Sequence, residues 1–287
     1  MPRIVVTGAS RGIGFATALQ LARTGHEVVA AMRNPTGSPQ LADIAAQEKL
    51  PITVETMDVG SDSSVEQAFA RILRAGPVDV LVNNAGIDRM GAVEETPLAD
   101  FRACMETNYF GVIRCAQAVI RSMRERGSGA IINIASVAGK ISVAPMAAYS
   151  ATKFALEALS EALAQELRAF NIRVAIVEPG IIDTYMAHHI GDMEYSKVYP
   201  QARRVAAMFA STLAAGAGTP EMVAEKVCQI VDSGTWDLRH PVGPDAEPFL
   251  AWRRSLDDEK WVQWGAQSDA DWLQAVKANF GMDLKLQ

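Results

Sequence analysis

A short apolar run that leads directly into a glycine-rich turn opens the chain and restricts the folds available to it. Residues 4–6 are Ile-Val-Val, which is typical of a strand covered on both faces. The segment TGASRGIG follows at 7–14, and a helical pattern begins directly behind it. Apolar runs and helical patterns then alternate, which predicts an α/β fold with a doubly wound parallel sheet and right-handed crossovers. The further predicted strands are 28–32, 52–57, 78–82, 130–135, 173–177 and 238–242.

The length and composition predict one domain with one large core. The chain has 287 residues, of which 49% are hydrophobic. We therefore expect residues 1–287 to form a single domain. Within it, 185–218 is rich in Met, Ala, His and Tyr and has helical patches with few strand signals. Residues 245–287 are expected to form a helical C-terminal extension that packs on the body or on a partner chain. The extension carries four of the five tryptophans, Trp252, Trp261, Trp264 and Trp272.

Charge, cysteines and hydropathy exclude several classes of protein. A net charge of −6 argues against a nucleic-acid partner, because such proteins neutralise phosphates with basic residues. Cys104, Cys115 and Cys228 have neither CxxC nor zinc spacing and are expected to be reduced thiols. The first strand starts almost at residue 1, which leaves no room for a signal peptide. Apolar runs are too short for a membrane span. We expect a cytoplasmic protein without a membrane or nucleic-acid partner.

The glycine turn at 7–14 has the layout of a pyrophosphate site. Backbone N–H groups at a helix N-terminus can receive phosphate, and glycines allow the close approach that this needs. The alternative is a tight turn without a ligand. The spacing G-x3-G-x-G differs from the common dinucleotide fingerprint G-x-G-x-x-G. The turn therefore matches a dinucleotide site in its strand–turn–helix layout but not in its glycine spacing.

The end of the second predicted strand indicates which dinucleotide would bind. An NAD site usually has an acidic residue about twenty residues beyond the turn. Here the chain has Met32, Arg33 and Asn34. Arg33, together with Arg11 in the turn, could neutralise a 2′-phosphate by forked hydrogen bonds. We therefore predict NADP(H) over NAD(H), with a solvated arginine at Arg33 as the alternative.

Two further strand ends offer polar or small residues to such a ligand. Asp58 and Val59 follow the third strand and could contact an adenine, or they could belong to the N-cap region of the next helix. The segment 83–86, Asn-Asn-Ala-Gly, follows the fourth strand. It could admit a cofactor and brace neighbouring strands, or it could be a plain turn.

Ser136, Tyr149 and Lys153 form the candidate catalytic group. Tyr149 and Lys153 are four residues apart and would share one face of a helix. A neighbouring ammonium favours phenolate and would lower the pKa of the tyrosine towards working pH. Ser136 ends the fifth strand, where its hydroxyl could hydrogen-bond the same substrate oxygen. By itself the Tyr/Lys spacing also occurs by chance.

Asn108 interrupts a long amphipathic helical pattern at 98–126. Asparagine is unfavourable in mid-helix because its side chain competes for backbone groups. From the residue alone, a local kink or an exposed polar side chain is a commoner reason for such an asparagine than catalysis.

Taken together, these motifs resemble the short-chain dehydrogenase/reductase superfamily in its single-domain form, which has a Rossmann fold. The resemblance is close over residues 4–184 and looser over 220–244. Any one motif alone is weak evidence for the superfamily, but the whole set in this order is specific to it. The set comprises TGASRGIG at 7–14, NNAG at 83–86, Asn108, Ser136, YSATK at 149–153 and PGIIDT at 179–184.

The resemblance implies a role for each catalytic candidate. Tyr149 would protonate a carbonyl oxygen or take the proton of an alcohol. Lys153 would lower the pKa of Tyr149 and hold the nicotinamide ribose, and Ser136 would orient the substrate oxygen. Asn108 would kink its helix and hold a water that relays protons. The implied cofactor-binding residues are Gly8, Ser10, Arg11, Gly12, Ile13, Gly14, Arg33, Asp58, Val59, Asn83, Ala85, Gly86, Tyr149, Lys153, Pro179, Gly180, Ile182 and Thr184.

The C-terminal part is more similar to the branch with hydroxysteroid and retinol dehydrogenases than to shorter members of the superfamily. That branch implies a substrate lid over 185–218 and a fairly hydrophobic substrate. A lid packed on itself is the alternative, and no metal is expected at the paired histidines because no carboxylate or cysteine cluster accompanies them. The candidate pocket residues are Met186, His188, His189, Met193, Tyr195, Tyr199, Met208 and Phe209.

The leading expectation is an NADP(H)-dependent carbonyl reductase or secondary-alcohol dehydrogenase acting on a small molecule. A catalytically silent NADP(H) sensor on the same fold is the alternative, although sensors usually lack the Tyr/Lys pair. The glycine spacing and the short C-terminal part argue against a nucleotide-sugar epimerase or dehydratase. The helices at 98–126 and 149–170 pair into a four-helix interface in the family, so a homodimer is expected.

Overall fold

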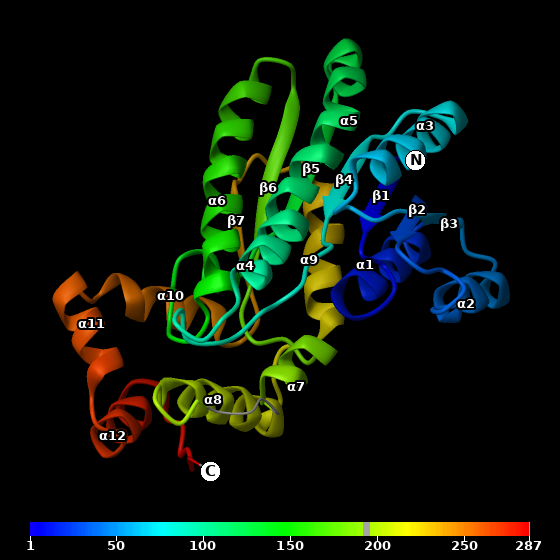
Figure 1. Ribbon diagram of the computed structural model, residues 1–287. Helices are drawn as coiled ribbons and strands as arrows, with labels where there is room; N and C mark the ends of the chain where they lie inside the picture. The colour runs from blue at the N-terminus through cyan, green and yellow to red at the C-terminus, as the bar shows by residue number, and fades with distance from the viewer. Residues whose placement is uncertain (192–195, 287) are drawn as a thin grey trace.

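A parallel sheet of seven strands forms the middle layer of the computed structural model, which describes residues 1–191 and 196–286 (Figure 1). The strand order is β3-β2-β1-β4-β5-β6-β7, and each neighbouring pair is parallel. The order reverses between β1 and β4, which is where open α/β sheets bind ligands. The strands are β1 (Arg3–Thr7), β2 (Glu27–Met32), β3 (Ile52–Thr56), β4 (Val80–Asn83), β5 (Gly129–Ile134), β6 (Ile172–Pro179) and β7 (Arg239–Val242).

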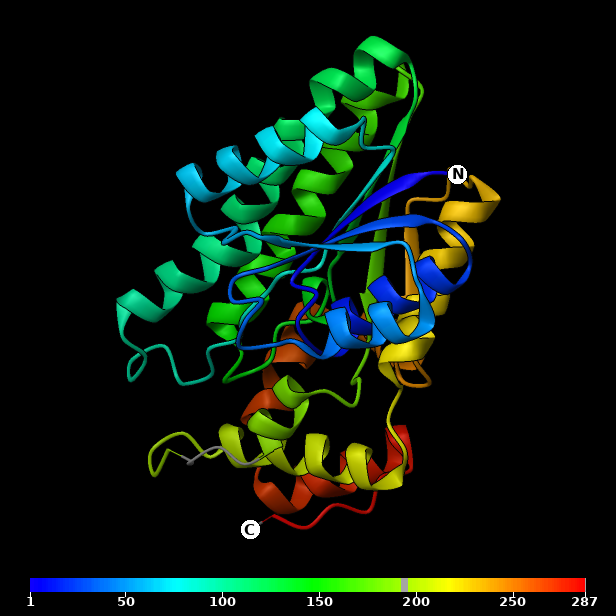
Figure 2. The same ribbon diagram turned by 90° about the vertical axis from the view of Figure 1, so that its right-hand side faces the viewer.

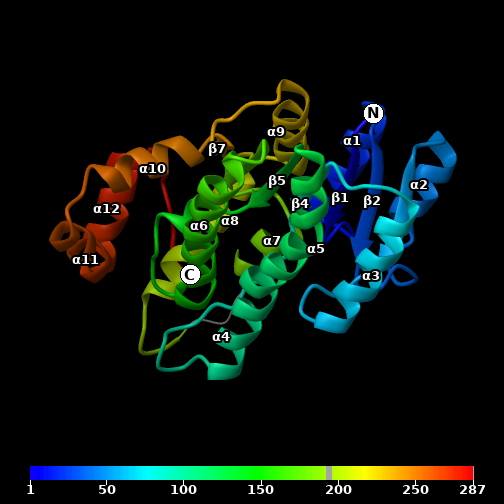
Figure 3. The same ribbon diagram turned by 90° about the horizontal axis from the view of Figure 1, so that it is seen from above.

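Helices cover both faces of the sheet, as the continuous apolar strands require (Figure 3). Ile4 and Val6 of β1 pack with α1 (Gly12–Arg23), α2 (Gln40–Glu48) and α9 (Pro220–Ser233) on one face. Val5 points to the other face, among residues of three more helices. These are α3 (Asp62–Ala75), α5 (Gly111–Arg126) and α6 (Ala147–Arg168). The predicted doubly wound α/β fold is confirmed.

The long helix predicted over 98–126 is three elements. α4 (Leu98–Met105) and α5 are joined by η1 (Glu106–Phe110), a single π-helical turn that contains Asn108. A π-turn inserts one residue into the helical ladder and often lies at a functional site. The kink expected at Asn108 is therefore present. The short 3-10 turn η2 (Val137–Gly139) follows β5 and precedes α6.

The remaining helices lie beyond the carboxyl ends of the strands (Figure 2). α7 (Tyr185–Gly191) and α8 (Gln201–Ala215) follow β6, and the C-terminal extension consists of α10 (Ala246–Arg254), α11 (Asp258–Ala266) and α12 (Asp269–Phe280). α12 lies beside α8, and Trp272 packs with Met208. Of the two alternatives for the extension, the structure places it on the body of the protein. Within the described residues, helices long and apolar enough to span a membrane are absent.

Candidate active site

A cavity of about 970 Å³ lies at the carboxyl edge of the sheet. Its wall comes from the loops after β1, β2, β3, β4, β5 and β6, which meet there because parallel strands end at the same edge. Most of the predicted site residues therefore come together. Those on the wall are Gly8, Ser10, Arg11, Gly12, Ile13, Arg33, Asp58, Val59, Ala85, Gly86, Ser136, Tyr149, Lys153, Pro179, Gly180, Ile182 and Thr184.

Gly14 and Asn83 lie behind the wall, so their predicted direct contact with a cofactor is not supported. A Cβ on Gly14 would stand 2.3 Å from Nδ2 of Asn84 and 2.4 Å from the carbonyl oxygen of Gly8, so this glycine lets α1 pack against the turn. Asn83 is buried and donates to Asn133 on β5 at 2.9 Å, which braces two strands. Asn84, which belongs to the predicted segment 83–86 but was not among the implied contact residues, lines the cavity.

The glycine turn has the geometry of a phosphate cradle. Gly8 has a φ of +68°, and a Cβ there would lie 2.7 Å from Cα of Ala85. The hydroxyl of Thr7 accepts hydrogen bonds from the backbone N–H groups of Asn84 and Ala85, both at 3.0 Å, which fixes the two loops together. Among the described residues, side-chain caps and first-turn acids are absent from the N-terminus of α1. Its N–H groups therefore suit an anionic group such as the pyrophosphate of a dinucleotide.

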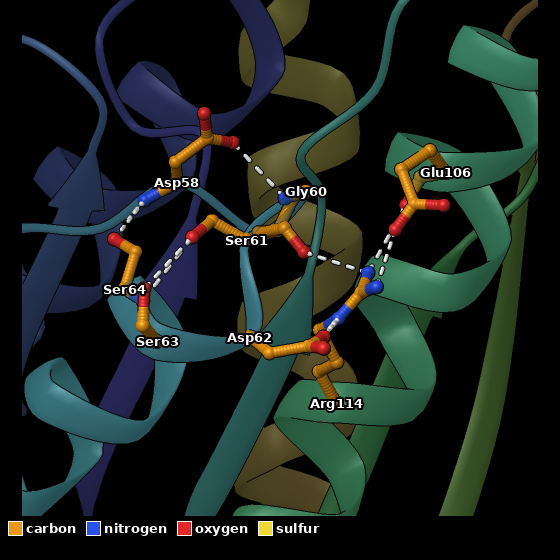
Figure 4. Close-up of polar contacts among 9 residues, drawn as sticks. Asp58, Gly60, Ser61, Asp62, Ser63, Ser64, Glu106 and Arg114 are labelled. Carbon is orange, nitrogen blue, oxygen red and sulfur yellow. Dashed lines mark hydrogen bonds and ion pairs between the residues drawn. The ribbon is translucent and has the colours of Figure 1, made fainter.

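Asp58 lies in the loop between β3 and α3 (Figure 4). Ser61 is the cap residue of α3 and accepts from the N–H of Ser64 at 3.3 Å. The backbone N–H of Asp58 donates to the hydroxyl of Ser64 at 2.9 Å, so Asp58 belongs to the N-cap region, and its contact with an adenine stays a prediction. The carboxylate of Asp58 accepts from the N–H of Gly60 at 3.0 Å and lines the cavity. Arg114 of α5 joins this loop to the π-turn, because it donates to the carboxylates of Asp62 and Glu106 and to the carbonyl of Val59.

Ser136 and Tyr149 lie together on the cavity wall. The Ser136 hydroxyl accepts from the N–H of Ala138 at 3.1 Å, which points it into the loop between β5 and α6. Burial raises the pKa of Tyr149 well above its ordinary value, and a hydrogen bond with Ser136 offsets this only in part. The expected lowering of the Tyr149 pKa is therefore not seen, because removal of the phenolate from water outweighs the other effects.

Lys153 lies under Tyr149 and is itself buried. Its Nζ donates to the carbonyl of Ile134 at 2.8 Å and stands 5.6 Å from the centre of the Tyr149 ring. Burial lowers the pKa of Lys153 to about 8, while the carboxylate of Glu157 one turn further along α6 acts in the opposite direction. The lysine is thus charged at neutral pH and close to the tyrosine, as the spacing predicted.

The side chain of Asn108 ties three elements together behind the cavity. Its Nδ2 donates to the carbonyl of Ile87 at 2.8 Å and to the hydroxyl of Thr152 at 3.0 Å, and its Oδ1 accepts from the N–H of Ile87 at 2.8 Å. Both amide hydrogens are used, so the amide positions the loop after β4 against α6. The amide oxygen accepts one of the two hydrogen bonds that it can take, so the expected relay water at Asn108 stays a prediction.

The two arginines of the predicted 2′-phosphate site occupy different surroundings. Arg33 is exposed at the end of β2, beside Asn34 and Ser38 on the cavity wall. The guanidinium of Arg11 lies 4.3 Å from the centre of the Tyr185 ring on α7. Both arginines therefore line the cavity, Arg33 with an exposed side chain and Arg11 against the helix that begins the predicted lid.

The candidate pocket residues of 185–218 divide into two groups. Met186, His189, Met208 and Phe209 line the cavity. His188 instead pairs with Asp183 at 2.8 Å on the surface, and the hydroxyl of Tyr199 donates to Glu94. Met193 and Tyr195 lie outside the described residues. The prediction also missed Asp88, whose pKa burial raises, and a group of aromatic side chains from the C-terminal extension.

Comparison with known proteins agrees with this geometry. The family model for short chain dehydrogenases matches residues 2–195. The uncharacterized oxidoreductase YusZ of Bacillus subtilis is 31% identical over 265 residues, which cover 90% of this chain and 94% of that protein. Retinol dehydrogenase 8 of Bos taurus is 41% identical over 186 residues, which cover 63% of this chain and 59% of that protein.

The solved structures include a short-chain dehydrogenase from Streptomyces avermitilis with a TM-score of 0.78 and 33% identity, which covers 92% of this chain and 97% of that one. The chain therefore belongs to the short chain dehydrogenase family, whose members are oxidoreductases acting on alcohol or carbonyl groups.

Proposed function

We propose that this protein is an NADP(H)-dependent carbonyl reductase or secondary-alcohol dehydrogenase. The observation that carries the proposal is that Ser136, Tyr149 and Lys153 line the same cavity as the glycine turn. A dinucleotide held by the turn would thus lie in the same cavity as the catalytic group. When bound, it would supply or accept the hydride.

Tyr149 would transfer the proton at the substrate oxygen. The phenol is protonated at neutral pH and can therefore give a proton to a carbonyl oxygen during reduction. The hydroxyl of Ser136 would donate to the same oxygen, where negative charge develops in the transition state. Lys153 would hold the ribose and add positive charge near the phenol, and Asn108 would position the loop after β4.

Arg33 supports NADP(H) over NAD(H). It lies on the cavity wall directly after β2, and a guanidinium can bind the 2′-phosphate that only NADP(H) carries. Two solved relatives carry this type of cofactor. A gluconate 5-dehydrogenase from Burkholderia cenocepacia, 28% identical with a TM-score of 0.73, is in complex with NADP and tartrate. Actinorhodin polyketide ketoreductase, 32% identical with a TM-score of 0.73, was solved with NADPH.

The substrate is proposed to be a small and largely apolar molecule. Met186, Met208 and Phe209 line the cavity beyond Tyr149, and flexible thioethers adapt to apolar ligands. Two relatives are named for apolar compounds, retinol dehydrogenase 8 and the 3-ketodihydrosphingosine reductase of Bacteroides thetaiotaomicron.

Oxidation of NADPH, followed at 340 nm with a panel of ketones, aldehydes and quinones, tests the proposal. We expect turnover with at least one ketone, loss of nearly all of it in Tyr149→Phe, and unchanged NADPH binding in that variant. Ser136→Ala should lose about 10²-fold in kcat, as for one oxyanion donor. Wild-type rates in Tyr149→Phe would overturn the assignment. Tight NADPH binding without turnover of any substrate would favour the sensor.

A homodimer is proposed through α5 and α6. Ala151, Phe154, Ala158 and Ala162 lie exposed along one side of α6, at the spacing of a helix-packing face. Phe154 is 44% exposed, as is Phe110 on the π-turn. This row of exposed apolar residues supports the proposal, because contiguous apolar surface is a feature of protein–protein interfaces.

A further inference from the structure

The cavity that holds the catalytic group extends well beyond it. Besides Tyr149, its wall includes Met208 and Phe209 of α8 and side chains of the C-terminal extension. Phe209 packs in one hydrophobic cluster with Tyr149, and Met208 packs in another with Trp264 and Trp272. Six aromatic residues of the extension lie on this wall, although they are about a hundred or more positions away from Tyr149 in the sequence. They are Phe249, Trp252, Trp261, Trp264, Trp272 and Phe280, which we call the aromatic wall.

The rings of the aromatic wall hold one another in a fixed arrangement. Trp252 makes edge-to-face contacts with Trp261 at 5.6 Å and with Trp264 and Phe280 at 4.9 Å between ring centres. Trp261 and Trp264 are stacked at 5.7 Å with an angle of 5° between their planes. Aromatic pairs prefer these geometries, so the contacts between the rings stabilise this arrangement of the wall.

Buried charges fix the aromatic wall to α8. Arg204 of α8 is 3% exposed, and its Nε donates to Asp269 at 2.8 Å. Its two Nη groups donate to the carbonyl of Gly265 at the end of α11, at 3.3 Å, and to that of Gln267 just after α11, at 2.8 Å. Arg203 also pairs with Asp269. A buried guanidinium with this many partners defines the position of the extension and therefore the width of the cavity.

The aromatic wall is only partly covered by the protein itself. Trp272 is 2% exposed and forms the core of the extension, but Trp252, Trp261 and Trp264 are half-buried beside the cavity. Val262 next to them is 68% exposed. An apolar surface of this kind inside a cavity that also contains a Ser/Tyr/Lys group suits the apolar part of a substrate.

We propose that the C-terminal extension is the far half of the substrate site, and that it takes an extended apolar group attached to the reacting carbonyl or alcohol. The inference rests on the proposed function for the reacting end of the substrate. It adds the substrate class, a ketone or secondary alcohol with a long apolar body, and the residues that select it.

A chain-length series of methyl ketones tests this proposal. For the wild type, kcat/KM should rise from 2-butanone through 2-octanone to 2-dodecanone, by up to about fourfold for each methylene that reaches the wall. Trp261→Ala should flatten this rise, with a loss of kcat/KM that grows from 2-butanone to 2-dodecanone. Trp261→Phe, which keeps an aromatic ring, should retain most of the rise. Trp236→Ala is the matched control, because Trp236 lies before the extension and contacts Arg168.

Binding of 2-dodecanone to NADPH-loaded Tyr149→Phe protein, measured by equilibrium dialysis, separates this inference from the proposed function. Binding that weakens about tenfold or more when Trp261→Ala is added, and not when Trp236→Ala is added, supports the inference even if no ketone turns over. The inference would be overturned if the two double variants, Tyr149→Phe with Trp261→Ala and Tyr149→Phe with Trp236→Ala, bound 2-dodecanone with equal affinity. It would also be overturned if Trp261→Ala lowered kcat/KM equally for all three ketones. Circular dichroism of each variant checks that the helices remain folded.

Discussion

At the scale of single residues, burial decides how the charged groups near the site behave. Glu178 at the end of β6 is 2% exposed, and burial together with the nearby carboxylate of Glu157 raises its pKa above the ordinary value. Arg239 stands 3.0 Å from Glu157 and 3.8 Å from Glu178, so the two acids share one main cation. Lys140 pairs with Glu157 at 3.1 Å. The network therefore favours one proton on Glu178.

Glu178→Gln should change how stability depends on pH. Because the folded-state pKa of Glu178 is raised, its contribution to stability is present below the unfolded pKa of about 4.5 and is lost as the pH rises through the raised value. The free energy of unfolding of the variant, relative to the wild type, should therefore increase between about pH 5 and pH 8. Urea titrations at several pH values measure this. Glu166→Gln, at an exposed position of α6, is the control. Parallel pH profiles of Glu178→Gln and wild type would contradict the prediction.

Arg33→Asp should reverse the cofactor preference. Loss of a charge-assisted hydrogen bond and addition of a carboxylate should weaken NADPH binding by about 10-fold to 100-fold. Binding of NADH should stay equal or become tighter, because an acid at this strand end suits a 2′-hydroxyl. Fluorescence titration with both cofactors gives the ratio of dissociation constants. An unchanged ratio would mean that Arg33 does not contact the 2′-phosphate.

At the scale of elements, the close approach of α1 to the loop after β4 shapes the cofactor end of the cavity. Gly14 in the first turn of α1 allows this approach, and Asn84 fills the space beside it by donating to the carbonyls of Thr7 at 2.9 Å and Gly8 at 3.2 Å. The contact explains why a glycine is needed inside a helix, where it would otherwise cost stability.

Gly14→Ala should destabilise the protein. Its Cβ would overlap backbone and amide atoms at 2.3–2.4 Å, and overpacking of this kind costs about 1–3 kcal/mol. The melting temperature should fall accordingly. Gly265→Ala in α11 is a matched control because, in the part of the chain described, nothing lies within 4 Å of its added Cβ. The control should be neutral or slightly stabilising, since alanine is the better helix former. A higher melting temperature for Gly14→Ala would show that α1 can move away from Asn84.

At the scale of the whole molecule, the exposed apolar face of α6 is the proposed contact surface of a homodimer. Phe154→Glu places a charge in the middle of the proposed interface between two copies, where an unpaired buried charge is costly. We expect light scattering to give a dimer for the wild type and a monomer for this variant. Val262→Glu, on the exposed side of the extension, should leave the dimer intact. A monomeric wild type would refute the proposed homodimer.

Local patterns in the sequence determined the fold and most of the candidate site. Strand and helix periodicity, the turn at 7–14 and the pair Tyr149 and Lys153 depend on residues close together in the chain. Parallel strands then bring their carboxyl ends to one edge, so the loops that carry Asp58 and Ser136 had to meet. For this reason the part of the cavity wall formed by the glycine turn and the strand ends could be predicted from the sequence.

The tertiary structure alone decided what depends on contacts between distant segments and on burial. The sequence places Asn83 and Gly14 in motifs that resemble a cofactor site. Only the tertiary structure shows that Asn83 hydrogen-bonds a neighbouring strand and that Gly14 allows α1 to pack closely against Gly8 and Asn84. The Tyr149 pKa moves upward because desolvation, which no spacing predicts, outweighs other effects. The aromatic wall reaches the cavity because Arg204 of α8 binds the connection after α11, and such a contact has no signature in local sequence.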